Sequence, residues 1–171
     1  MRGLLGSDLV SRGATLDLRV SEERLLWWKN PPAVPSTATT LPIEMHEWMV
    51  GSYKDRGLVA GDITLDGKPV KLMLDTGSPR ILIISSTARP NETVEETFDG
   101  NGNPVTLYVS TTRVKFGGGP EFEVGLDRAE AFPLLEETVK HLGGDVAGLL
   151  GLNALGHERI IIAKDKLAFV R

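Results

Sequence analysis

Residues 69–84 decide how this chain folds, and they read PVKLMLDTGSPRILII. An apolar strand leads directly into Asp75, a Thr-Gly turn follows, and a second apolar, β-rich run covers residues 80–85. Two buried strands joined by a sharp glycine turn present a carboxylate at a fixed point. A carboxylate in such surroundings is costly unless it is hydrogen-bonded or paired. Asp75 is therefore the first candidate for chemistry.

A second motif lies far downstream, where residues 145–155 read DVAGLLGLNAL. It contains the apolar-apolar-glycine segment Leu149, Leu150 and Gly151, and a closing hairpin of residues 159–163 and 166–170 follows. Residues 133–141 are predicted to form a helix, because a proline stands in the first turn and two glycines stop it. A strong hairpin signal, Asp66-Gly67, joins the predicted strands 58–65 and 68–74.

The two motifs together resemble those of aspartic proteases, in the branch that includes the retropepsins. Residues 74–78 look like the active-site motif of that family, and residues 149–151 like the segment that packs beside it. The order of hairpin, Asp-Thr-Gly, glycine-rich flap, strands, Leu-Leu-Gly, short helix and last hairpin covers residues 57–171. The resemblance implies a mostly β fold, a closed β-barrel of the acid-protease type with one or two short helices.

The resemblance also implies a mechanism for peptide hydrolysis without a cofactor. Asp75 would be one half of a carboxylate dyad that shares one proton and activates a water. Thr76 would hold the two catalytic loops together, and Gly77 would let the backbone approach the carboxylates. Ser78 would donate its hydroxyl to the outer oxygen of Asp75, with Leu149, Leu150 and Gly151 supporting the loop from behind.

Residues 97–108 combine glycines and asparagines between two strand-like flanks. Such a sequence is most often an exposed turn, and the functional interpretation is a flap that closes over a bound polypeptide. On that interpretation Gly100, Asn101, Gly102 and Tyr108 bind substrate.

The chain holds one Asp-Thr-Gly only, so a dyad needs a partner. The simplest partner is a second copy in a two-fold homodimer. However, residues 1–29 form a partial repeat that resembles the C-terminal end of a retropepsin-like domain. Residues 3–9 match residues 148–155, with Gly-Leu-Leu-Gly at the start of each. Residues 15–18 align without a gap with residues 160–163, and residues 24–27 align with residues 166–169. The repeat is the end of an upstream half-domain, an interface segment or an unordered remnant, and the sequence does not choose among the three.

Composition narrows the function classes. Residues 30–42 are a Pro/Thr-rich linker, which leaves residues 43–171 as the protease-like domain. With a net charge of −4 and no basic stripe, no nucleic-acid partner is expected. There is no cysteine, the three histidines lack ligand spacing, and no metal is expected. No signal peptide or membrane segment is evident, which favours an intracellular location and no membrane partner.

Two function classes remain. The first is an aspartic endopeptidase acting on polypeptide substrates, for which the intact Asp-Thr-Gly argues. The second is a non-catalytic domain of the same fold, used for dimerisation or peptide binding, or an inactive fragment of a tandem protease. The single motif and the unusual N-terminal repeat favour this second class.

Overall fold

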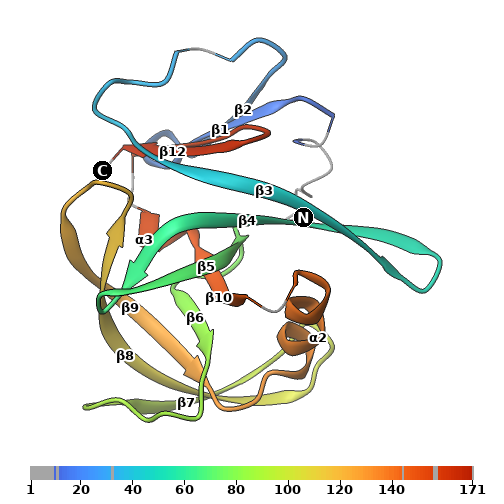
Figure 1. Ribbon diagram of the computed structural model, residues 1–171, viewed down its shortest axis with the longest axis vertical. Helices are drawn as coiled ribbons and strands as arrows, with labels where there is room; N and C mark the ends of the chain where they lie inside the picture. The colour runs from blue at the N-terminus through green and yellow to red at the C-terminus, as the bar shows by residue number, and fades with distance from the viewer. Residues whose placement is uncertain (1–9, 11, 32, 144, 156–157, 171) are drawn as a thin grey trace.

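The protein is mostly β (Figure 1), and the computed structural model describes residues 10, 12–31, 33–143, 145–155 and 158–170. The strands are β1 Thr15–Arg19, β2 Arg24–Trp28, β3 Thr39–Val50, β4 Tyr53–Leu65, β5 Lys68–Asp75, β6 Ile81–Ile84, β7 Thr93–Phe98, β8 Pro104–Phe116, β9 Glu121–Ala129, β10 Val146–Gly151, β11 Arg159–Ile162 and β12 Lys166–Val170. The helices are α2 Pro133–His141, α3 Leu152–Leu155 and a 3-10 turn, η1, Val20–Glu22. The start of the first repeat, residues 3–9, lies outside the described residues.

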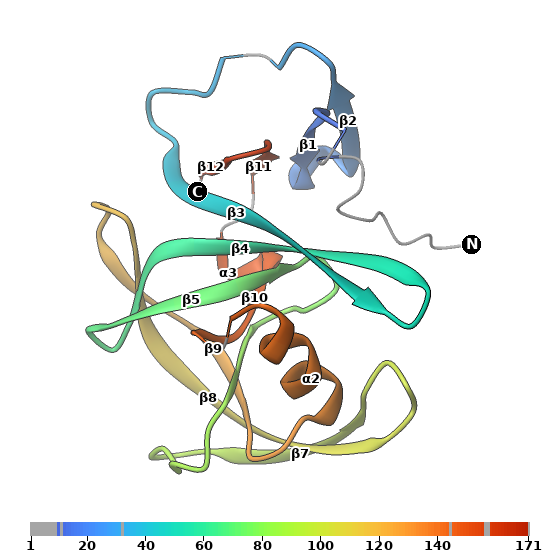
Figure 2. The same ribbon diagram turned by 45° about the vertical axis from the view of Figure 1, so that its right-hand side comes forward.

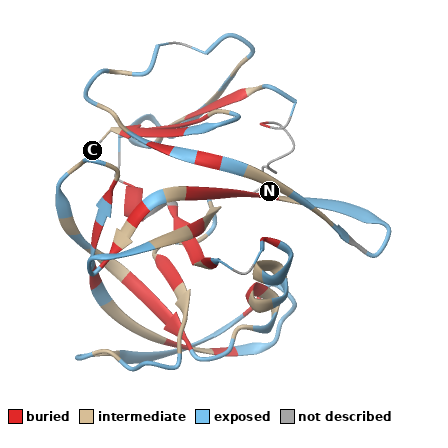
Figure 3. Ribbon diagram, viewed as in Figure 1, coloured by how far each residue is buried: buried red, intermediate tan, exposed pale blue. Residues whose placement is uncertain are grey.

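The strands are hydrogen-bonded in the order β2-β1-β11-β12-β3-β4-β5-β10-β6-β9-β8-β7, and β4 also pairs with β8. The order therefore returns from β8 to β4. The main core lies inside this turn of the sheet, and Figure 3 shows the buried positions along β4, β9 and β10. Its side chains include Leu58, Ile63, Leu72, Val114, Leu126 and Leu150.

The hairpin that delivers Asp75 forms as predicted. Asp66 and Gly67 have φ angles of 47° and 78°, the left-handed values that the two central residues of a tight hairpin turn require. The Asp66 carboxylate accepts bonds from the Arg113 N–H at 3.0 Å and the Arg89 guanidinium at 2.7 Å. The turn is therefore bonded to both β8 and the segment after β6.

The predicted linker is too long by four residues, because β3 begins at Thr39 rather than after residue 42. The free edge of β12 provides hydrogen-bonding partners, and Leu41 lies opposite Leu167. Leu41 is 1% exposed, so burial of its side chain adds to the pairing. The helix predicted for residues 133–141 is confirmed as α2.

The N-terminal repeat forms a hairpin that joins the sheet (Figure 2). β1 pairs with β2 on one side and with β11 on the other. Its Asp17 is fully buried, and both carboxylate oxygens accept hydrogen bonds from Arg159 at 2.8 Å. A bidentate pair of this kind fixes the hairpin to the closing strands.

This ion pair makes the attachment of the hairpin sensitive to acid. Burial raises the pKa of Asp17, but the hydrogen bonds and charge of Arg159, with the charge of Arg19, outweigh it and hold that pKa below its usual 3.8. A depressed pKa stabilises the folded state above the unfolded value, and this stabilisation is lost as pH falls through the folded value. We expect Trp28, which lies on β2 opposite Thr15 of β1, to change its fluorescence in an acid titration below pH 3.8. The same titration of Asp17→Asn should lack this transition, and its persistence there would contradict the assignment.

Among the described residues, no helix has the length and apolar character needed to cross a membrane.

Candidate functional site

Asp75 is the last residue of β5 and is half-buried. Its Oδ1 accepts a hydrogen bond from the Gly77 N–H at 2.8 Å. The Thr76-Gly77 turn is exposed, so the carboxylate stands at an accessible edge with one oxygen fixed by backbone. The predicted contact between Gly77 and the carboxylate is thus present in the structure.

The Leu-Leu-Gly segment lies directly beside this loop. β10 runs parallel to β5, with Leu150 opposite Leu74 and Gly151 opposite Asp75, and antiparallel to β6 on its other side. Leu150 is fully buried. Residues that are far apart in the sequence are therefore brought together as predicted, with β10 between the two strands that flank the Asp75 loop, residues 75–80.

Gly151 is required by the close approach of the loop. A Cβ atom there would lie 2.4 Å from the Arg80 carbonyl oxygen and 2.5 Å from that of Ser78. Both contacts are with backbone, so Gly151→Ala should displace the loop and lower the free energy of unfolding by about 1–3 kcal/mol, as overpacking usually does. The matched control is Gly118→Ala, whose Cβ would meet nothing within 4 Å. Urea unfolding of both variants checks this, and equal stabilities would contradict it.

Ser78 does not make the predicted bond to Asp75. Its hydroxyl donates to the Arg80 carbonyl oxygen at 2.8 Å instead. The turn brings the carbonyl of Arg80, two residues on, within hydrogen-bonding distance of this hydroxyl. Ser78 therefore stabilises the loop through a hydrogen bond within it. The predicted bond of Thr76 to a second loop is not seen among the described residues and stays a prediction.

The predicted flap is the hairpin of β7 and β8, and its tip is an organised turn. The buried Asp99 carboxylate accepts the N–H groups of Asn101 and Asn103 at 2.9 and 2.8 Å and the Asn103 side-chain amide at 2.9 Å. These hydrogen bonds, from the Asn103 amide first, hold the pKa of Asp99 below its usual value. Gly102 has a φ of 83° in this turn. The sequence interpretation as an exposed turn or a flap did not identify Asp99 as the residue that organises the tip.

The tip of the predicted flap lies close to helix α2, since a Cβ added at Gly100 would lie 3.3 Å from Leu134. The outer strand β7 is exposed along its whole length and ends the sheet. Whether Gly100, Asn101 and Gly102 bind substrate stays a prediction.

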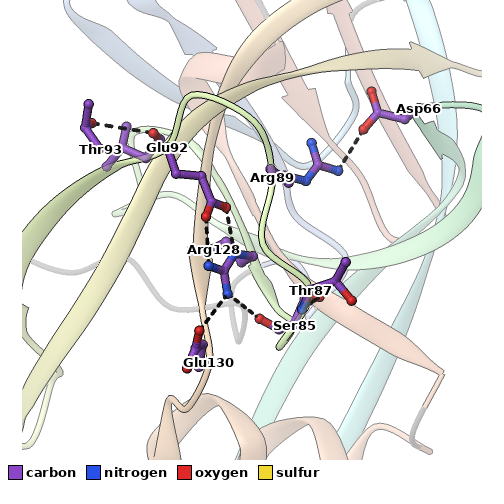
Figure 4. Close-up of polar contacts among 9 residues, drawn as sticks. Asp66, Ser85, Thr87, Arg89, Glu92, Thr93, Arg128 and Glu130 are labelled. Atoms are coloured by element: carbon purple, nitrogen blue, oxygen red, sulfur yellow. Dashed lines mark hydrogen bonds and ion pairs between the residues drawn. The ribbon is translucent and has the colours of Figure 1, made fainter.

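Tyr108 lies within β8, and the Arg128 guanidinium covers its ring at 4.1 Å from the centroid. Arg128 is 1% exposed and also forms a bidentate pair with Glu92, at 2.6 and 2.8 Å. Figure 4 shows this arginine bonded to Glu92, Glu130 and the Ser85 carbonyl, which anchors the segment between β6 and β7 to β9. One face of Tyr108 is therefore used in packing, a role that the sequence did not suggest.

Arg80, two residues beyond Ser78, links the Asp75 loop to the β7–β8 hairpin, the predicted flap. Its guanidinium forms ion pairs with Asp127 on β9 at 2.7 Å and with Glu95 on β7 at 3.0 Å. Burial raises the pKa of Asp127 above its usual value, although Arg80 partly offsets this. An arginine directly after the Asp-Thr-Gly-Ser-Pro turn was a signal in the sequence, but its two partners could not be found without the fold.

The loop after β5 presents the Asp75 carboxylate, a group that can act as a general acid or base. Within the described residues, no three His, Asp or Glu side chains come together as metal ligands. Asp75 supplies one acid, and the exposed Thr76-Gly77 turn beside it is accessible to a partner that carries a second acid.

A comparison of the sequence with models of protein families finds no match, and a comparison with curated proteins finds no significant relative.

Proposed function

We propose that this chain supplies one half of an aspartic endopeptidase site, in a closed β-barrel of the retropepsin-like type. The observation that carries the proposal is the position of Asp75. Its carboxylate lies in an Asp-Thr-Gly turn, and Gly151 of the Leu-Leu-Gly strand pairs directly beside it. Two separate motifs that resemble the same family meet at the same point. The return of the strand order from β8 to β4 supports the barrel.

The reaction needs a second carboxylate close to Asp75. Two carboxyl groups within about 3 Å cannot both ionise, so they share one proton and titrate as a pair. The ionised member removes a proton from a water, whose oxygen adds to the scissile carbonyl carbon. The protonated member gives its proton to the carbonyl oxygen. The C–N bond of the tetrahedral intermediate then breaks as the nitrogen takes up a proton, and no covalent enzyme intermediate forms.

The substrate is an extended polypeptide, because a flap hairpin beside a sheet edge binds a strand through main-chain hydrogen bonds. The exposed β7 edge offers such hydrogen-bonding groups. The arginine pairs at Arg80 and Arg128 hold the hairpin in a fixed place relative to Asp75.

The test compares two peptides of the same sequence, one with an ordinary scissile bond and one with a hydroxyl-bearing tetrahedral carbon in its place. A catalytic dyad should bind the tetrahedral analogue at least about 10²-fold more tightly and release new amino termini from the ordinary peptide. The assay uses the chain over a concentration series and the two-lobed form described below. Equal affinity for both peptides with no cleavage would overturn the proposal.

That contrary outcome would favour the second candidate, a non-catalytic domain that binds peptide or a partner domain. The observation in its favour is the single Asp-Thr-Gly in the chain.

A further inference from the structure

The β1–β2 and β11–β12 hairpins are joined by the pairing of β1 with β11, and a two-fold axis perpendicular to the sheet relates them. In the β1–β11 pairing, Leu16 lies opposite Ile162 and Leu18 lies opposite Ile160, with Asp17 opposite Ile161 between them. A rotation about the Asp17–Ile161 pair therefore exchanges Leu16 with Ile160. Directly paired residues share one face of the sheet. This equivalence therefore keeps the apolar side chains of both strands, Leu16 and Leu18 on β1 and Ile160 and Ile162 on β11, on the core face. The ungapped alignment of the sequence, which matched Leu16 with Ile161, was off by one residue.

The equivalence extends to the second strand of each hairpin. Trp27 pairs with Leu16 as Phe169 pairs with Ile160. Leu25 likewise pairs with Leu18, as Leu167 pairs with Ile162. Trp27 is thus the counterpart of Phe169, and Leu25 the counterpart of Leu167, in agreement with the alignment of residues 24–27 with 166–169.

The counterparts differ sharply in burial. Leu167 and Phe169 are 0% and 2% exposed, whereas Leu25 and Trp27 are 47% and 67% exposed. On one side of the axis the barrel covers the apolar face, and β3 pairs along the outer edge of β12. On the other side β2 ends the sheet, and no described strand pairs with its outer edge. Figure 2 shows the β1–β2 hairpin standing away from the barrel.

We propose that the β1–β2 hairpin is the closing hairpin of a second lobe, built like residues 39–155, which covers Leu25 and Trp27. A strand equivalent to β3 pairs with the free edge of β2. A loop equivalent to residues 75–78 then faces Asp75 across the two-fold axis and supplies the other acid. This last step rests on the proposed function, whereas the covering lobe rests on pairing and burial alone.

A second copy of the chain does not fit the same place. A symmetric dimer about this axis would pair β11 of each copy with β11 of the other, but β1 of the same chain already occupies that edge. The buried pair of Asp17 and Arg159 holds β1 there. A lobe continuous with the hairpin meets no such obstacle, because it leaves the β1–β11 pairing in place.

The experiment uses a two-lobed chain in which a copy of residues 37–151 precedes residue 7, so that Gly151 of the copy takes the place of Gly6. A second form carries Trp27→Phe, to match Phe169, and its cover is read from the oxidation of Leu25, the other exposed residue of this face. Hydroxyl-radical oxidation of Trp27, read by peptide mass spectrometry against Trp48 in the original lobe, reports on cover. We expect oxidation of Trp27 to fall several-fold relative to the 171-residue chain, with the mass of a single chain in solution. Unchanged oxidation, or failure of both forms to fold, overturns the proposal.

A chain in which a disulfide holds β1 against β11 tests whether a second copy, rather than a continuous lobe, covers Leu25 and Trp27. Leu18→Cys with Ile160→Cys places the only two cysteines at directly paired positions, whose Cα separation suits a disulfide. We expect the disulfide to form within one chain. Disulfides between copies, or peptide hydrolysis that appears only on reduction, would make a second copy the occupant and overturn the proposal. Protection of Trp27 without hydrolysis in the two-lobed chain would retain the lobe and reject the protease.

Discussion

Replacing Asp75 by asparagine is expected to abolish peptide hydrolysis. The amide is close in size to the carboxylate and can keep accepting the Gly77 N–H at its oxygen, so the loop should retain its shape. It cannot take a proton from water or share one with a second acid. Loss of the general base should cost about 10²- to 10⁴-fold in kcat/KM, or more where the pair acts as a unit.

The measurement is the rate at which new amino termini appear from an unfolded protein, in the two-lobed chain with the substitution made in either lobe. Asp165→Asn is the matched control, since Asp165 is an exposed aspartate in the β11–β12 turn. Each Asp75 variant should be inactive and the control fully active. Full hydrolysis by an Asp75→Asn variant would remove this residue from the mechanism.

Replacing Arg159 by methionine is expected to lower the free energy of unfolding by about 3 kcal/mol, because it leaves the buried Asp17 carboxylate without its bidentate partner. Arg19, at 3.7 Å from the same carboxylate, compensates only partly. Denaturant unfolding at neutral pH, with hydrogen exchange of β1 to locate the change, measures the loss.

The matched control removes both charges together, in Asp17→Leu with Arg159→Met. Replacing a buried ion pair by apolar groups of similar volume is often neutral or stabilising. We therefore expect the double variant to be more stable than Arg159→Met alone. If the two variants lose the same free energy, the pair does not fix the hairpin.

Much of the sheet could be predicted because its signals are local. Asp66-Gly67 specified the hairpin before Asp75, and Pro133 and the glycines after residue 142 set the ends of helix α2. The meeting of Asp75 with Gly151 was predicted from the resemblance, since no local signal in the sequence places β10 beside β5.

Other features could not be predicted, because they depend on distant partners. The pairing of β6 with β9 brings Arg80 and Arg128 close to the acidic side chains with which they form ion pairs. Ser78 donates its hydroxyl to the Arg80 carbonyl oxygen rather than to Asp75. The one-residue offset between the two hairpins was hidden because the second copy has a shorter connection before β11. The offset becomes visible only from the register of β1 with β11, which shows which side chains share a face of the sheet. The same comparison shows that Leu25 and Trp27 are exposed where their counterparts are buried.

The most direct test of the central claim, that Asp75 works with an acid from a second lobe, is the dependence of specific activity on protein concentration. Hydrolysis per chain should be independent of concentration in the two-lobed form, and the 171-residue chain should be inactive over the same range. Specific activity of the 171-residue chain that rises with concentration would contradict this account and show that two copies bring their Asp75 residues together.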